Sequence, residues 1–235
     1  MVRRARSPWC AACFPVDANQ PGHMESSREV VCRSNSFKLL GACFYEPDKE
    51  IFIEERVCAN LASQLRDVCP EAAACAEKME AELERETQQR LRVDYAALFV
   101  GPFALIAPPY GSVYLEQNRR VMGDSTQMVK RYYQDAGLTV EMKEPPDHIA
   151  IEFEFMYFLL AKEITARAED LTGKTTCLRQ LQSNFFNSAM PWIPEFTARL
   201  QAGAATDYYR ELAKCTSNFY DGCCKFYATD TAHGI

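Results

Sequence analysis

The chain has 235 residues, of which 48% are hydrophobic, so it is long enough to bury a sizeable core within one domain. Its net charge is -6, and basic residues alternate with acidic ones, which argues against a nucleic-acid-binding surface. The longest apolar run covers only residues 155–161, far short of the roughly 20 residues that span a bilayer, so no transmembrane segment is predicted.

The cysteines and the first residues bear on the compartment and on domain organisation. Eleven cysteines, mostly single residues on predicted helices, favour a reducing compartment over a disulfide scaffold. Paired arginines begin the chain, but the apolar stretch of a secretory signal does not follow them. Cys10 and Cys13 resemble half of a metal site without its other ligands, so no metal is predicted. We interpret residues 1–24 as a disordered extension and residues 25–235 as one domain.

The first half of the chain is predicted to be a series of helices. Apolar residues recur at helical spacing after Ser27, and Pro47 stops that helix. The pattern resumes at Ile51, and Pro70 begins a helix rich in alanine, glutamate and lysine. These helices are predicted over residues 27–45, 51–68, 71–91 and 93–99.

The segment after residue 99 carries aromatic residues on irregular backbone. Phe103, Tyr110 and Tyr114 lie among prolines and a glycine that a regular helix would not accept. Rings with hydroxyl groups in such a loop favour a pocket rim that can hold an extended peptide. Core packing is an equally good interpretation of Leu98 and Phe99, at the helix end. Residues 113–122 fit both an extended and a helical conformation.

The second half of the chain is also predicted to be helical. Asp124 or Ser125 would cap a helix that ends at Ala136, followed by Gly137 in the left-handed conformation. The next helix is apolar almost all round, which predicts a central buried helix interrupted by Gly173. No alternating run with hairpin turns is present, so the fold class is all-α, a single-domain helical bundle. These helices are predicted over residues 124–136, 147–170, 175–189, 194–201 and 207–227.

One motif resembles a phosphate-binding loop, ending in Gly173, Lys174 and Thr175. Such a loop requires a strand that leads into glycine-rich backbone, whereas here a long helix precedes the motif. A helix end followed by the polar start of the next helix is the favoured interpretation. A nucleotide-binding enzyme that uses these residues is kept as an alternative.

Asp147 and His148 follow Pro145 and Pro146, where a helix is predicted to begin. Together they could act as a general acid–base pair. Structural roles explain them equally well. The negative charge of Asp147 would interact favourably with the helix dipole, and His148 could pair with Glu152 one turn later. The chain offers no nucleophile motif and no metal constellation, so catalysis is not favoured.

Several segments resemble one protein family, the TorD/DmsD/NarJ redox-enzyme maturation chaperones, and most nearly its DmsD-like branch. The resemblance is dense over residues 95–156 and extends more weakly to KLLGACFYEP, MPWIPEF and YYRELAK. The segments that carry it are LFVGPFALIAPPYGSVYLE, GDST, GLTVEMK and EPPDHIAIEFEFM.

This resemblance implies an all-helical, non-enzymatic, cytoplasmic chaperone. Such a protein binds the twin-arginine signal peptide of a molybdopterin-containing oxidoreductase, assists cofactor loading and proofreads export towards the twin-arginine translocase. The family allows weak guanine-nucleotide binding without a tightly bound cofactor, and either a monomer or a domain-swapped dimer with a hinge near residues 142–146. An assembly factor that grips the mature apo-enzyme is the nearest alternative.

The family's signal-peptide site maps onto this chain residue by residue. Asp147 and His148 would form its polar hot spot, with Lys38 at its edge. From the residues themselves, Asp147 and Glu144 could accept charge-assisted hydrogen bonds from a guanidinium group, while the rings and Pro109 take an apolar segment. Tyrosine and phenylalanine stand where close relatives show tryptophan. The other implied site residues are Tyr95, Leu98, Phe99, Phe103, Pro109, Tyr110 and Tyr114.

Overall fold

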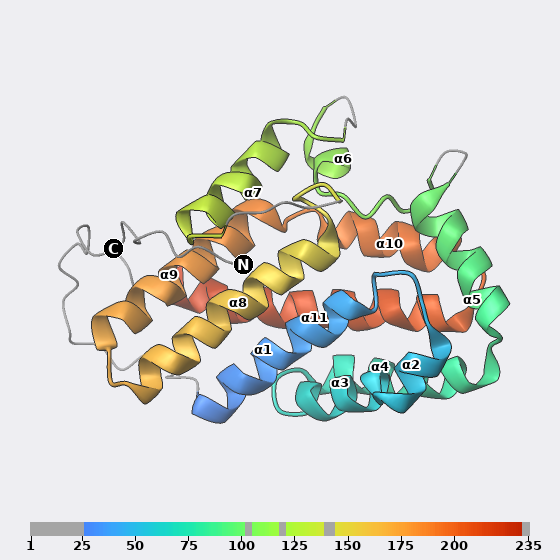
Figure 1. Cartoon of the computed structure of the whole chain (residues 1–235), viewed down its shortest axis with the longest axis horizontal. Helices are drawn as coiled ribbons and strands as arrows, with labels where there is room; N and C mark the ends of the chain where they lie inside the picture. Colours follow the sequence, from blue (N-terminus) through green and yellow to red (C-terminus); the bar gives the residue numbers. More distant parts are fainter. Residues whose placement is uncertain (1–25, 102–104, 118–120, 139–143, 232–235) are drawn as a thin grey trace, which may run out of the picture.

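The computed structural model describes residues 26–101, 105–117, 121–138 and 144–231, and these form an all-α bundle (Figure 1). Within these ranges the chain forms no strand, only an isolated antiparallel bridge between Tyr110 and His148. The all-α prediction is therefore confirmed. The predicted extension over residues 1–24 lies outside the described residues, as does part of the predicted hinge.

The helices follow the predicted order with shifted boundaries. Their bounds are α1 (Ser27–Ala42), α2 (Lys49–Glu54), α3 (Val57–Leu65), α4 (Pro70–Arg85), α5 (Gln88–Tyr95), the π-helical turn η2 (Ala96–Val100), α6 (Ser112–Leu115), α7 (Asp124–Asp135), α8 (Ile149–Ala168), α9 (Thr172–Ala189), α10 (Ile193–Gly203) and α11 (Asp207–Thr231). No helix in these ranges has the length and apolar character needed to cross a membrane.

Two predicted helices are each divided in the structure. The helix predicted over residues 51–68 breaks at Arg56, whose φ of 50° places it in the left-handed region. The helix predicted over residues 71–91 ends at Arg85, and Thr87 caps the next helix by accepting a hydrogen bond from the Arg90 amide at 3.2 Å. The break before α5 therefore coincides with a side-chain cap, whereas the break at Arg56 comes from the backbone conformation without a side-chain cap.

The predicted central helix is confirmed as α8, which lies between α1 and α9 and in front of α11 in Figure 1. Most of its apolar residues are buried, which explains why few polar residues interrupt it. The Phe37 ring of α1 packs edge-on against Phe153 of α8, with centroids 5.5 Å apart, and against Phe219 of α11 at 4.8 Å. These contacts join α1, α8 and α11 in one core.

The interruption after α8 differs from the prediction. Asp170, with a φ of 54°, makes the turn, and Gly173 lies in the first turn of α9. Lys174 and Thr175 therefore belong to a helix that follows another helix, without the strand and loop of a phosphate-binding motif.

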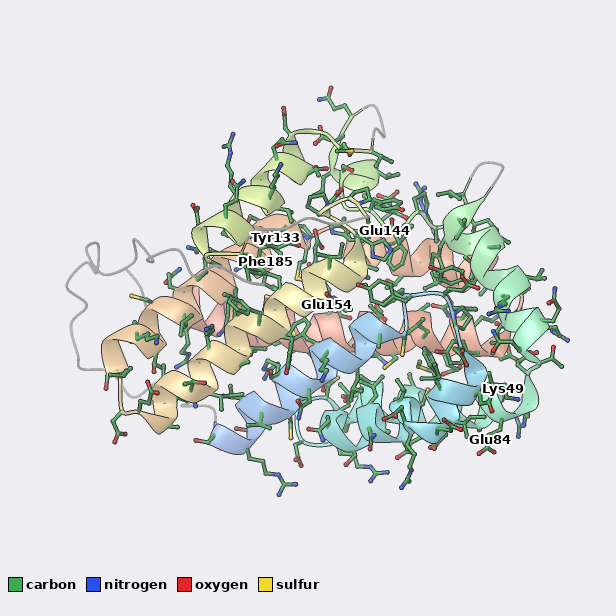
Figure 2. The ribbon with its side chains drawn as sticks, viewed as in Figure 1. Lys49, Glu84, Tyr133, Glu144, Glu154 and Phe185 are labelled. Atoms are coloured by element: carbon green, nitrogen blue, oxygen red, sulfur yellow. The ribbon has the colours of Figure 1, made fainter. Side chains whose placement is uncertain are left out.

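Helix α7 is fixed to the bundle by aromatic packing. Its Tyr133 ring lies 4.6 Å from Phe155 of α8 and 6.1 Å from Phe185 of α9, centroid to centroid (Figure 2). Gly123 occupies the cap position instead of Asp124 or Ser125. The predicted left-handed Gly137 is confirmed, with a φ of 79°.

A buried aspartate joins the start of α11 to α5. The Asp94 carboxylate is buried and accepts hydrogen bonds from the Ala205 and Thr206 amides and from the Thr206 hydroxyl, at 2.7–3.1 Å. Since η2 continues directly from α5, this junction also fixes η2 against the bundle. One wall of the site described next is therefore built on rigid structure.

Candidate functional site

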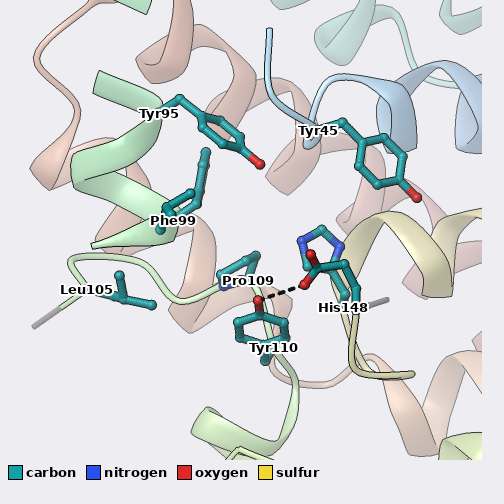
Figure 3. A pocket seen from close by; sticks show the side chains of 9 residues that line it. Tyr45, Tyr95, Phe99, Leu105, Pro109, Tyr110 and His148 are labelled. Carbon is teal, nitrogen blue, oxygen red and sulfur yellow. Dashed lines mark hydrogen bonds between the residues drawn. The ribbon is translucent and has the colours of Figure 1, made fainter. Parts of the chain in front are cut away.

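An open pocket of about 180 Å³ lies where the end of η2, the loop after it and the start of α8 meet (Figure 3). Aromatic rings form much of its surface, and a glutamate and a histidine supply polar groups. Its lining residues are Tyr45, Tyr95, Phe99, Val100, Leu105, Pro109, Tyr110, Glu144 and His148.

Two backbone hydrogen bonds build the wall of this pocket. The Ile149 amide donates to the Pro109 carbonyl, and the Gly111 amide donates to the Asp147 carbonyl, both at 2.9 Å. They pair the loop with the residues before α8 and place Tyr110 opposite His148. The loop after η2 and the residues before α8, which are distant in sequence, are therefore held in a fixed alignment.

Behind this wall a tryptophan packs against backbone. A Cβ atom at Gly111 would lie 2.8 Å from Trp192 Nε1, so only glycine fits there without a shift. The Tyr114 ring stacks on Trp192, with centroids 5.3 Å apart. Tyr114 thus supports the loop from behind and does not line the pocket.

His148 is the N-cap of α8, and its Nδ1 accepts a hydrogen bond from the Ala150 amide at 3.2 Å. Burial lowers the pKa of His148 to about 4, against the opposing charges of Glu144 and Asp147. The imidazole is therefore neutral near pH 7, with its proton on Nε2. Nε2–H remains available as a hydrogen-bond donor.

Asp147 points away from solvent and is only 1% exposed. Its Oδ2 accepts a hydrogen bond from the Ser112 amide at 2.8 Å, whereas Oδ1 has no partner among the described residues. The structure thus places this predicted hot-spot carboxylate behind the pocket wall, where it fixes the start of α6 and does not face a ligand.

Tyrosine hydroxyls lie beside carboxylates at the pocket. Tyr110 donates to Glu144 Oε2 at 3.1 Å, and Tyr45 donates to Glu154 Oε1 at 2.8 Å. Burial, followed by the charge of Glu144, raises the pKa of Tyr110 and of Tyr95 to about 12. These phenols remain protonated and can donate hydrogen bonds near neutral pH.

The pocket brings together six of the residues predicted for the site. Leu98 is fully buried in the core, and the Lys38 ammonium of α1 lies 5.4 Å from the centre of the Tyr157 ring, outside the pocket lining. Phe103 lies outside the described residues. Those gathered at the pocket are Tyr95, Phe99, Pro109, Tyr110, Glu144 and His148.

Sequence reasoning missed Tyr45, Val100 and Leu105, which also line the pocket. Tyr45 follows α1 and comes to the site only through tertiary packing, with its ring stacked on His148 at a centroid distance of 6.0 Å. The expected pairing of His148 with Glu152 is wrong, because His148 caps the helix and Glu152 Oε2 accepts from Trp192 Nε1 at 3.1 Å.

Glu152 is fully buried, and its Oε1 has no hydrogen-bond partner among the described residues. Burial, with the nearby Asp147 charge, raises its pKa well above the usual value of 4.5. A raised folded-state pKa gives stability that is present below pH 4.5 and is lost as pH rises. We expect Glu152→Gln, which keeps an acceptor for Trp192, to stabilise the protein by about 1 kcal/mol at pH 8.

Thermal unfolding at pH 5 and pH 8 measures this effect. The gain in Tm from Glu152→Gln should be larger at pH 8, because glutamine does not titrate. A variant that is less stable than the parent at both pH values would show that the Glu152 carboxylate is stabilising.

The fold and the site define a helical protein with an aromatic, acidic pocket, and comparison with known proteins identifies its family. The sequence model of the nitrate reductase delta subunit family matches residues 58–198, so the chain belongs to this family. The crystal structure of a proposed redox enzyme maturation protein from Archaeoglobus fulgidus has the same fold, with a TM-score of 0.53 and 23% identity over 87% of this chain and 98% of that one. The family predicted from the sequence is confirmed.

Curated relatives share this ancestry. The Tat proofreading chaperone DmsD of Salmonella typhi is 27% identical over 75% of this chain and 81% of its own length. The chaperone protein TorD of Vibrio cholerae is 28% identical over 57% of this chain and 61% of its own. A perchlorate reductase assembly chaperone protein from Dechloromonas aromatica is 29% identical over 54% and 59%. The chain thus matches about three fifths of the length of the last two.

Proposed function

We propose that the protein is a cytoplasmic chaperone that binds the twin-arginine signal peptide of a molybdopterin-containing oxidoreductase. In this role it assists cofactor loading and delays export until loading is complete. The observation that carries the proposal is the pocket, where an exposed carboxylate, Glu144, stands beside aromatic rings. Relatives named as proofreading and assembly chaperones support the same role.

The pocket chemistry matches the two parts of such a peptide. A guanidinium group forms charge-assisted hydrogen bonds with a carboxylate such as Glu144. The apolar residues after the arginines can pack on Tyr95, Phe99 and Pro109. Neutral His148 donates from Nε2 and adds no positive charge that would repel an arginine. Binding therefore needs no covalent chemistry.

We infer that the protein is not an enzyme and holds no tightly bound cofactor. His148 Nδ1 is already engaged by the Ala150 amide, and among the described residues that line the pocket there is no serine or cysteine. Gly173 and Lys174 lie exposed in the first turn of α9, which gives a nucleotide no enclosing loop. These observations favour a binding protein over the nucleotide-dependent enzyme.

Calorimetric titration with leader peptides tests the proposal. One peptide carries the native Arg-Arg pair of a candidate client leader, and its control carries Lys-Lys with the same charge. We expect micromolar affinity for Arg-Arg, which corresponds to about -8 kcal/mol, and about tenfold weaker binding of Lys-Lys. Capture of the cofactor-free enzyme without binding of any leader would instead favour the factor that grips the mature apo-enzyme.

A further inference from the structure

Two tyrosine–glutamate pairs flank His148. The Tyr110 ring meets the imidazole edge-on with centroids 5.4 Å apart, and its hydroxyl holds Glu144. The Tyr45 ring is stacked on the same imidazole, and its hydroxyl holds Glu154. In Figure 3 the imidazole lies between the two tyrosine rings, and the Tyr45 hydroxyl points towards α8, which carries Glu154. Two carboxylates, each oriented by its own phenol, therefore lie on the two sides of His148: Glu144 in the pocket lining and Glu154 outside it, beyond Tyr45.

The other acidic groups near the pocket are already engaged or inaccessible. Glu46 is paired with Arg92, with 3.1 Å between Oε1 and Nε. Asp147 and Glu152 are buried, so a guanidinium group from solvent cannot reach them. Glu144 and Glu154 are both exposed, and among the described residues neither forms a salt bridge with lysine or arginine. These two carboxylates are therefore the ones available to a cationic ligand.

The geometry of an extended peptide makes two separate acceptors useful. Consecutive side chains of an extended chain point to opposite sides of its backbone. Neighbouring arginines consequently cannot both turn towards one carboxylate without bending the peptide. A site that recognises the pair needs an acceptor on each side, and each guanidinium prefers a carboxylate that is already fixed in position.

We propose that Glu144 and Glu154 each bind one guanidinium group of the arginine pair, with Tyr110 and Tyr45 as the residues that position them. The inference rests on the proposed function and extends it, because it assigns a second arginine subsite to Glu154. Each arginine is then recognised by its own carboxylate. The protein can distinguish an Arg-Arg peptide from a peptide with a single arginine only when both subsites are intact.

A cycle of protein and peptide variants tests this arrangement. Glu144→Gln and Glu154→Gln are titrated with peptides that carry Arg-Arg, Ala-Arg or Arg-Ala. Each substitution should weaken Arg-Arg binding about tenfold, or about 1.4 kcal/mol. In each variant, replacing one of the two arginines by alanine should leave the peptide affinity unchanged, whereas replacing the other should still weaken binding. The arginine whose loss has no effect should be a different one in the two variants.

The matched control is Glu169→Gln, which removes the same charge from an exposed residue just past the other end of α8. It should bind all three peptides like the parent protein. Tyr45→Phe keeps the ring that stacks on His148 but removes the hydroxyl, and it should reproduce a smaller part of the Glu154→Gln effect on the same arginine. Circular dichroism verifies that each variant is folded.

The outcomes separate this inference from the proposed function. If the parent protein prefers Arg-Arg but Glu154→Gln binds like Glu169→Gln, the second subsite is refuted and the signal-peptide function stands. Equal weakening of all peptides by both glutamine variants would also refute it, since that pattern indicates general electrostatic attraction. If the parent protein binds no arginine-pair peptide, the proposed function fails together with the subsite.

Discussion

Asp147→Ala is expected to lower the free energy of unfolding by about 2 kcal/mol and to weaken Arg-Arg peptide binding at least tenfold. The substitution leaves the buried Ser112 amide without its acceptor, now 2.8 Å away. Ser112 directly follows the loop that carries Tyr110, so this loop loses one contact that fixes its position, although the backbone hydrogen bond from the Gly111 amide to the carbonyl of residue 147 remains. Urea denaturation and calorimetric titration of the same preparation measure both effects.

Asp147→Asn is the control for this prediction. Its amide oxygen can accept from the Ser112 amide in place of Oδ2, so we expect stability and peptide affinity to stay near the parent values. A different pattern would contradict the buried position of Asp147. If Asp147→Ala kept full stability and both substitutions abolished peptide binding, the carboxylate would contact the arginine directly, as the resemblance alone implies.

Much of the fold follows from local sequence patterns. The apolar residues around α8 predicted a central buried helix, and most of these residues are buried in the structure. Gly137 predicted a left-handed helix end because glycine accepts a positive φ without strain. Pro145 and Pro146 placed the start of α8 to within two residues. In each case the signal and the structure that it specifies are close together in the chain.

The features that sequence analysis missed depend on contacts between distant segments. Asp147 is turned inward because the Ser112 amide, 35 positions earlier, needs an acceptor. Tyr45 reaches the pocket only because α1 packs along α8. The break at Arg56 likewise interrupts an apolar pattern that would suit one continuous helix. The residues that the family resemblance implies for the site include six that line the pocket, but neither the resemblance nor the local pattern showed which side chains face solvent.

The position of His148 makes the protein sensitive to acid. Burial lowers the pKa of His148 from 6.5 to about 4 in the folded state. Between these values the unfolded chain binds the proton and the folded chain does not, so stability falls as pH decreases through this window. The shift corresponds to about 3 kcal/mol of stability that is present at pH 7 and is lost by pH 4. The side chain is only 4% exposed, so solvent screening does not reduce this effect.

His148→Asn isolates this contribution, because asparagine is also a good N-cap but does not titrate. Urea denaturation of both proteins between pH 7 and pH 4 should show that the parent loses about 3 kcal/mol more than the variant. Comparing the two proteins removes the effect of the carboxylates that they share. Parallel loss of stability in both would mean that His148 titrates normally in the folded protein. That result would require an accessible imidazole that becomes charged below about pH 6.5, where it would repel an arginine bound at Glu144.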